Sequence, residues 1–123
     1  MRLHHVALSV RDLDRAEKFY VGVLGLAIER RWNDDAGAPR STWLKLEGGA
    51  RLMLERDASA KETTRCLAFA IAPDERAGWR SKLEAAGVRV ESETEHTLYV
   101  RDPDGHRIGL SSWPIEAVQS SVT

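Results

Sequence analysis

Residues 3–13, LHHVALSVRDL, decide how the rest of the chain is interpreted. Apolar side chains at positions 6, 8 and 10 alternate with smaller or polar ones at positions 5, 7 and 9. This period of two is typical of a strand with one apolar face and one more polar face. Asp12 follows directly, and its carboxylate suits the capping position of a helix, where it accepts hydrogen bonds from unpaired amides. The stretch therefore predicts a strand that leads into a helix.

The same order of elements occurs twice along the chain. Apolar residues recur at helical spacing from Leu13 to Leu24, Gly25 provides a left-handed stop, and strand-like runs follow at 26–32, 42–46 and 51–55. After a polar linker at 56–64 the pattern begins again. A strand is expected at 65–71, a helix from Pro73 to Gly87, and strands at 88–91, 97–101 and 107–111. The pattern is βαβββ repeated, with a period of about sixty residues.

Length and composition set the frame for this repeat. The chain has 123 residues, which is the usual size of one domain. We expect a single α+β domain over residues 1–123, with module one at 1–56, module two at 64–113 and a polar tail at 116–123. The net charge of −1 gives no support to nucleic-acid or membrane-surface binding. The single cysteine and the lack of a leader or membrane-spanning pattern favour a cytoplasmic location.

Two motifs give this repeat a resemblance to a known superfamily. The opening residues 3–13, followed by Phe19-Tyr20 and by VLGL at 23–26, resemble the start of vicinal oxygen chelate proteins. The segment DPDGHRI at 102–108 is similar to their closing segment. This superfamily comprises glyoxalases, bleomycin resistance proteins and extradiol dioxygenases. The resemblance implies two βαβββ modules that form a curved, eight-stranded, cup-shaped mixed sheet with helices outside and ligands inside. It also implies a homodimer, in which modules from different subunits can complete each cup.

The resemblance further implies where a metal would bind. The strand period turns His5, Met53, Cys66 and Gly109 inward, and these positions match the four metal-ligand positions of the superfamily. Its metalloenzymes place His or Glu there, which suits zinc, nickel, manganese or iron. Here His5 keeps the pattern, Met53 is a poor ligand, Gly109 has no side chain, and Cys66 more often behaves as a small hydrophobe. His4 is expected on the opposite face.

We therefore expect no complete metal centre, with His5 and Cys66 as the remaining candidate ligands for a divalent metal. By the same parity the cup wall is aromatic and basic, with Glu55 as an inward acid. The expected ligand-binding residues, besides the four above, are Trp43, Lys45, Arg51, Tyr99, Arg101 and Arg107. Such a wall indicates a small, planar, anionic ligand. The alternative is that the aromatic residues fill a tight cup or a dimer seam and that the arginines lie on its rim.

Three functions remain open at this stage. The first is a metal-independent protein that binds a small molecule in the cup. The second is a lyase, isomerase or dioxygenase that uses His5 with non-standard ligands or as an acid–base, since a histidine titrates near neutral pH. The third is a structural or regulatory dimer without a ligand. His106, beside the 102–105 turn, is expected to be exposed and without a catalytic role.

Overall fold

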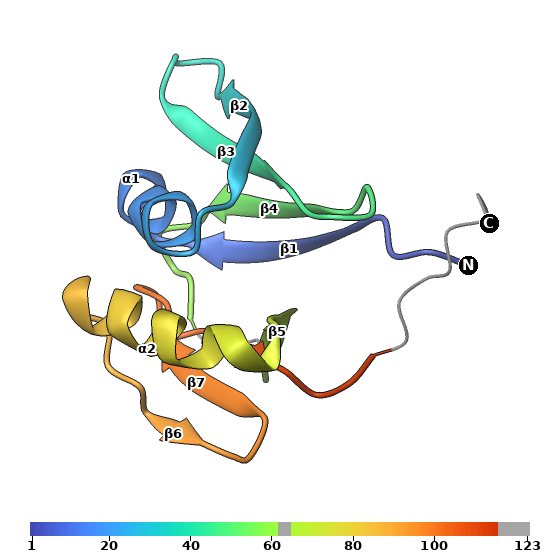
Figure 1. The fold of residues 1–123 in the computed structure, drawn as a ribbon. Coiled ribbons are helices and arrows are strands. Elements are labelled where there is room, and N and C mark those ends of the chain that lie inside the picture. Colours follow the sequence, from blue (N-terminus) through green and yellow to red (C-terminus); the bar gives the residue numbers. More distant parts are fainter. Residues whose placement is uncertain (62–64, 116–123) are drawn as a thin grey trace.

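The predicted double βαβββ order is present in the computed structural model, which describes residues 1–61 and 65–115. Figure 1 shows module one, from blue to green, stacked on module two, from yellow to red. Module one contains β1 (His5–Val10), α1 (Leu13–Glu17), the π-helix η1 (Lys18–Val23), β2 (Ala27–Asn33), β3 (Pro39–Lys45) and β4 (Arg51–Arg56). Module two contains β5 (Leu67–Ala70), the short 3₁₀ turn η2 (Pro73–Glu75), α2 (Arg76–Ala85), β6 (Ser92–Glu93), β7 (Thr97–Arg101) and β8 (Arg107–Ser111).

Each module has its own four-stranded mixed sheet, which confirms the predicted fold class. The strand orders are β1-β4-β3-β2 and β5-β8-β7-β6. In each sheet the first and last strands of the module pair in parallel, and the other neighbours are antiparallel. The eight strands of one chain are thus divided between two sheets, and β1 and β5 each lie at a sheet edge.

The residues that begin and end the helices have the roles that the sequence predicts. The carboxylate of Asp12 accepts a hydrogen bond from the backbone N–H of Arg15 at 3.1 Å, so Asp12 is the predicted cap. Gly25 and Gly87 follow the two helices with φ of +79° and +73°, a region that disfavours other residues. None of the helices in the described ranges is long and apolar enough to cross a membrane.

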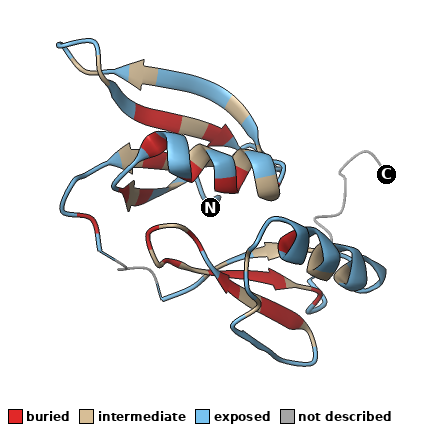
Figure 2. Ribbon diagram, turned by 90° about the vertical axis from the view of Figure 1, so that its left-hand side faces the viewer, coloured by how far each residue is buried: buried red, intermediate tan, exposed pale blue. Residues whose placement is uncertain are grey.

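The apolar faces of both sheets meet in one core that spans the modules. Its fully buried side chains include Leu52 and Leu54 from β4 and Leu98 and Val100 from β7. Figure 2 shows these buried segments on the inner strands and on the inward side of α1. Because helix and strand residues of both modules share this core, each module helps to bury the other's apolar surface.

The strand predicted at 88–91 is wrong in its position. The structure starts β6 at Ser92 and gives it only two residues. The backbone N–H of Val88 instead donates to the carbonyl of Leu83 at 2.8 Å, which closes the end of α2 and leads the chain away from β7. The first contact with β7 is the bond from the N–H of Glu91 to the carbonyl of Tyr99, also 2.8 Å long.

A buried polar network around the 102–106 turn joins the two modules, and we call it the module clasp. The hydroxyl of Tyr20 donates to Oδ2 of Asp102 at 2.6 Å, and Oδ1 of Asp102 accepts the backbone N–H groups of Asp104 and His106. Burial and the nearby Asp102 charge raise the pKa of Tyr20 above its usual range, so its hydroxyl remains a donor.

His106 completes the module clasp, and the prediction that it is exposed is wrong. Its side chain is fully buried, and Nε2 lies 2.9 Å from the backbone oxygen of Ser9 in β1. Since a carbonyl can only accept, Nε2 carries a proton. Oδ1 of Asp104 accepts from both Arg11 and Arg15 of module one.

Candidate functional site

The predicted site residues of module one share one face of its sheet, on the side away from the core. The strand registers arrange this concave face as three rows of cross-strand neighbours. The rows are His5, Arg51 and Lys45; Ala7, Met53, Trp43 and Arg30; and Ser9, Glu55, Ser41 and Trp32. The alternation of the sequence therefore places these side chains correctly relative to the core, and cross-strand pairing brings them together.

Aromatic and basic groups dominate this concave face. The rings of Trp32 and Trp43 lie 5.5 Å apart, and the guanidinium of Arg30 lies over the Trp32 ring at 4.1 Å. Arg51 is paired with Glu29 at 2.5 Å. This pair holds the pKa of the Glu29 carboxyl below its usual range. Lys45 has no hydrogen bond or ion pair within the described ranges, so its charge is available to another group.

Three polar atoms on this concave face are buried without a partner. They are Nε1 of Trp32, Nε1 of Trp43 and Oγ of Ser41, which belong to neighbouring positions of β2 and β3. All three groups can donate a hydrogen bond. Such a donor, when buried and unpaired, costs about 1–3 kcal/mol. The face therefore has hydrogen-bonding capacity that the described residues leave unused.

Sequence reasoning missed Arg30, Trp32 and Ser41 as members of this face. Ser41 follows the alternation of Trp43 and Lys45, but the strand was expected to begin at residue 42, whereas β3 begins at Pro39. Arg30 and Trp32 were missed for another reason. The register of β2 against β3 shifts between Ile28 and Arg30 and again after Trp32. Simple alternation fails across such irregularities because an extra residue reverses which side chains point inward. No sequence pattern indicated that the side chains of Trp32 and Arg30 would join this face.

His4 also departs from the expectation that it faces away from the site. It precedes the first residue of β1, so the strand alternation does not orient it. Its Nδ1 lies 2.9 Å from Nδ1 of His5, and the two rings meet edge to face. Both imidazoles are exposed, and one of the two nitrogens must carry the proton that they share.

Module two presents a crowded face around Gly109. Gly109 lies between Ala68 of β5 and Tyr99 of β7. A Cβ at position 109 would lie 3.3 Å from Cβ of Ala68, 3.3 Å from Cγ2 of Thr97 and 3.4 Å from Cε1 of Tyr99. The guanidinium of Arg107 lies over the Tyr99 ring at 4.0 Å. Tyr99 and Arg107 thus cover the place where a longer side chain at 109 would project.

The four positions that the superfamily uses for metal are split between the two sheets. His5 and Met53 belong to the sheet of module one, whereas Gly109 lies in the sheet of module two and Cys66 is exposed just before β5. The described residues contain no group of three His, Cys, Asp or Glu side chains placed to hold a metal ion. Met53 and Gly109 offer no suitable donor for zinc, nickel, manganese or iron, so the residues do not fit the family's four-ligand set.

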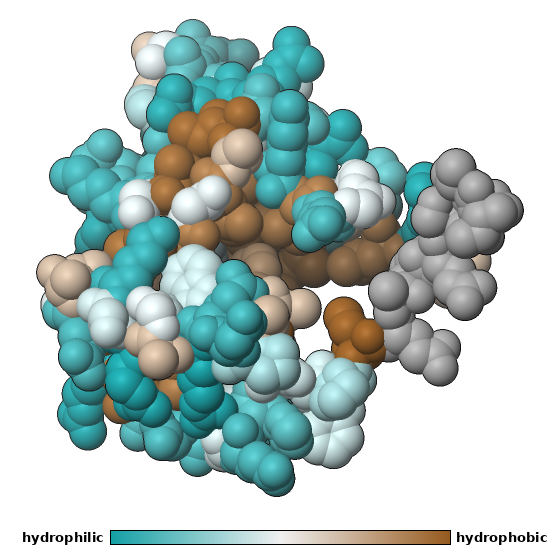
Figure 3. Space-filling model, in the orientation of Figure 1, coloured by the Kyte–Doolittle hydropathy of each residue, from teal (hydrophilic) through white to brown (hydrophobic). Residues whose placement is uncertain are grey.

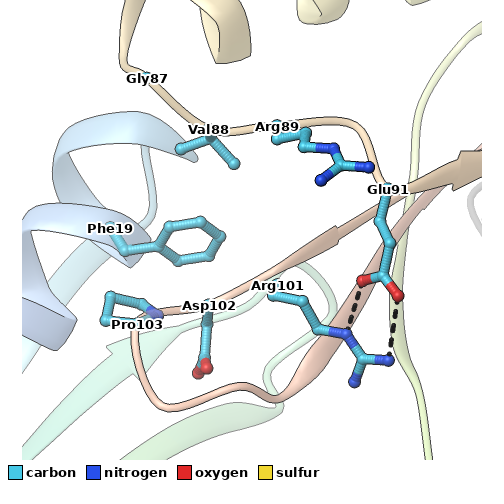
Figure 4. Close-up of a pocket in the computed structure, with 8 residues that line it drawn as sticks. All are labelled: Phe19, Gly87, Val88, Arg89, Glu91, Arg101, Asp102 and Pro103. Atoms are coloured by element: carbon cyan, nitrogen blue, oxygen red, sulfur yellow. Dashed lines mark hydrogen bonds and ion pairs between the residues drawn. The ribbon is translucent and has the colours of Figure 1, made fainter.

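Two further cavities, among others in the described part of the chain, bear on function. Figure 3 shows apolar surface gathered in a hollow between the modules. This hollow, of about 450 Å³, is lined by apolar residues of both modules and includes Leu24, Leu46, Phe69, Trp79 and Ile115. The second cavity, of about 580 Å³, lies beside the 87–91 segment, and Arg101 is in its wall (Figure 4). Arg101 is there held by Glu91 at 2.7 Å and by the carbonyl of Gly105.

Comparison with known proteins agrees with this architecture. Residues 2–110 match the Glyoxalase/Bleomycin resistance protein/Dioxygenase superfamily. The chain belongs to this superfamily. The chain is 29% identical over 112 residues to the glutathione transferase FosA of Serratia marcescens, covering 88% of this chain and 78% of FosA.

Solved structures show the same superfamily fold. A fosfomycin resistance protein, FosX, from Listeria monocytogenes in complex with Mn(II) and 1S,2S-dihydroxypropylphosphonic acid aligns with a TM-score of 0.80 at 20% identity, over 93% of this chain and 94% of FosX. The lactoylglutathione lyase of Agrobacterium tumefaciens aligns with a TM-score of 0.74 at 24% identity, over 93% of this chain and 97% of the lyase. At these identities the likeness concerns the fold.

Proposed function

We propose that this protein binds a small, planar anion on the concave face of module one, in a cup that module two completes. The observation that supports this best is the arrangement around Trp43, with Arg30 beside it and Lys45 in the next row. An indole face stacks well on a flat ligand, and a cation next to it holds a carboxylate or phosphonate. Lys45 makes no hydrogen bond or ion pair within the described ranges, although its charge contributes to lowering the pKa of Glu29, and it is the first candidate for that cation.

The unpartnered donors indicate that the ligand carries acceptor oxygens. Trp32, Trp43 and Ser41 each place a buried donor on the same face. Acceptor oxygens that reached these groups after a small rotation of the indoles would restore the hydrogen bonds lost on folding. A carboxylate, phosphonate or phenolate ligand has such oxygens, and an aliphatic hydrocarbon does not.

We propose that binding proceeds without a family-type metal centre. Two of the four ligand positions hold Met53 and Gly109, and the space above Gly109 is taken by Tyr99. A catalytic metal usually needs about three protein ligands. His5 therefore serves as a pocket histidine that contacts the ligand, and Cys66 as a small side chain on the opposite wall.

A second copy of the chain is the proposed partner that closes the cup. The carbonyls of His4, just before β1, and of Val10, at its end, accept hydrogen bonds from the β4 side. Because backbone groups alternate in direction along a strand, those of Ala7 point to the opposite, open edge of the sheet. In β5 the N–H of Ile71 bonds to β8, which leaves those of Ala70 pointing outward. These edges leave backbone N–H and C=O groups without a strand partner, and an apolar hollow of about 450 Å³ lies between the modules. A second copy of the chain has the same open edges and could pair with them.

One observation favours a second candidate function, a metal-dependent lyase, isomerase or dioxygenase. His4 and His5 lie in contact, with nitrogens 2.9 Å apart, so two imidazoles are available where the superfamily's first ligand lies. Imidazole suits zinc, nickel, manganese and iron. Cys66 from a second copy would have to add a third donor in this alternative.

Ligand and metal titrations test the two candidates together. Tryptophan fluorescence is followed while aromatic carboxylates and phosphonates, including fosfomycin, are added to the wild type and to Lys45→Ala and Trp43→Phe. Arg40→Ala, an exposed position on β3, is the matched control for losing a cation. We expect saturable quenching that Lys45→Ala weakens about tenfold and Arg40→Ala leaves intact.

Elemental analysis after incubation with zinc, nickel, manganese and ferrous iron tests the metal-dependent alternative. Near-stoichiometric metal that disappears in His4→Ala and His5→Ala would replace the binding proposal with the enzyme alternative. If neither a ligand nor a metal binds, the protein is a structural or regulatory dimer, and the proposal is wrong.

A further inference from the structure

The cavity of about 580 Å³ beside the 87–91 segment lies outside the proposed cup and uses none of its predicted aromatic residues. It lies where residues 88–90 run apart from β7, before Glu91 makes the first hydrogen bond to that strand. The Glu91–Arg101 ion pair, 2.7 Å long, spans the gap at its lower end. Its volume falls in the range of small-molecule sites, which is about 300–1,000 Å³.

The walls of this cavity combine one apolar side with one cation, Arg89, whose charge contributes to lowering the pKa of the Glu91 carboxyl but which forms no ion pair within the described residues. Figure 4 shows the Phe19 ring and Val88 facing a common space, with the guanidinium of Arg89 at its edge. Pro103 extends the apolar side. Arg89 is exposed and makes no hydrogen bond or ion pair within the part of the chain that the structure describes.

The two acids of the cavity are already occupied. Glu91 is held by Arg101, and that pair keeps the pKa of the Glu91 carboxyl below its usual range. Asp102 belongs to the module clasp, where its carboxylate accepts from the Tyr20 hydroxyl and from two backbone N–H groups. In Figure 4 its side chain turns away from the open space. Arg89 is therefore the charge that an incoming ligand meets.

We propose that this cavity is a second ligand site, which takes a small carboxylate with an aromatic or branched apolar body. The body lies against Phe19, Val88 and Pro103, and the carboxylate pairs with Arg89. Arginine forms a two-pronged contact with a carboxylate, and the small accessible part of the Phe19 ring, which is 4% exposed, continues the apolar wall of Val88 and Pro103. Phe19 comes from module one and the other groups from module two, so the ligand bridges the modules next to the module clasp.

Phenylacetate, with its neutral amide phenylacetamide, is the probe for this site. Amide chemical shifts are followed by NMR during titration of the wild type, Arg89→Ala and Arg89→Lys. Arg40→Ala is the matched control, because Arg40 is an exposed arginine on β3, away from the cavity. Trp43→Phe reports on the proposed cup.

We expect saturable shifts at Phe19, Val88 and Arg89, and a melting temperature that rises with phenylacetate. Arg89→Ala should weaken binding about tenfold or more, Arg89→Lys should retain part of it, and phenylacetamide should bind as weakly as phenylacetate does to Arg89→Ala. Arg40→Ala and Trp43→Phe should leave the saturable shifts at Val88 and Arg89 unchanged, whatever Trp43→Phe does to shifts on the concave face. Shifts confined to the concave face, equal affinity in Arg89→Ala, or no saturable shift at about 50 mM probe would each overturn the proposal.

Discussion

At the scale of single residues, Gly109 allows the close packing of side chains on the face of module two. The ring of Tyr99 lies across the glycine, and Arg107 covers that ring from the other side at 4.0 Å. Ala68 and Thr97 approach from the flanking strands, so the backbone of β8 is enclosed on this side. The absence of a side chain here is a packing requirement in this structure.

Gly109→Ala is therefore expected to destabilise the fold by about 1–3 kcal/mol, because the new methyl group meets two strand neighbours at 3.3 Å. Gly78→Ala is the matched control, since Gly78 lies in α2 and a Cβ there meets nothing within 4 Å. That change should stabilise the protein by about 0.5–1 kcal/mol through helix propensity. Urea denaturation of both variants measures the difference, and equal stability of Gly109→Ala and the wild type would contradict this account.

At the scale of elements, the module clasp makes the 102–106 turn a structural joint. The turn was recognisable in the sequence from its Asp, Pro and Gly residues. Its partners were not, because Tyr20 and Ser9 lie more than 80 positions away, with Tyr20 and Asp102 separated by 82 residues. A long-range contact of this kind leaves no local pattern, and this is why His106 was expected at the surface.

Tyr20→Phe tests the module clasp at its shortest bond. Loss of the hydroxyl leaves Oδ2 of Asp102 buried without its donor, and we expect a loss of about 1–3 kcal/mol in the free energy of unfolding. Tyr99→Phe removes a hydroxyl that makes no hydrogen bond within the described residues, so it should have little effect. Calorimetric melting of both variants gives the comparison. If the two variants melt together, the Tyr20–Asp102 bond contributes no net stability.

The secondary structure was largely predictable, and the exceptions have local causes. Alternation and helical spacing placed β1, β4 and both helices, because those signals are set by which face is buried. The strand at 88–91 was misplaced because the N–H of Val88 bonds to the carbonyl of Leu83 at the end of α2, so the chain reaches β7 only later. On the concave face, Trp43 and Lys45 were found from parity alone, whereas Arg30 and Trp32 needed the irregular register of β2.

At the scale of the whole molecule, the strands of the described residues form two separate sheets rather than one continuous cup. The edge strands β1 and β5 belong to different sheets, and apolar surface remains open between the modules. Exposed Trp113 and Ile115 lie at 65% and 72% of full exposure after β8, which is high for such residues in a monomer. A cup needs walls from both kinds of module, so pairing of chains and ligand binding should be linked.

Ile115→Glu puts this link to the test. Because Ile115 is 72% exposed yet lines the hollow, a charge there should leave the fold of one chain intact and weaken association about tenfold or more. Ala36→Glu, in the loop between β2 and β3, introduces the same charge at an exposed position away from the hollow. Sedimentation across a range of protein concentrations measures the dimer fraction, and fluorescence titration on the same samples measures ligand affinity. If the cup is shared between chains, Ile115→Glu should lower the ligand affinity and the dimer fraction together. Ala36→Glu should change neither the ligand affinity nor the dimer fraction. Full ligand affinity in a monomeric Ile115→Glu protein would show that the concave face of module one binds its ligand alone, because no second chain would then be needed to hold it.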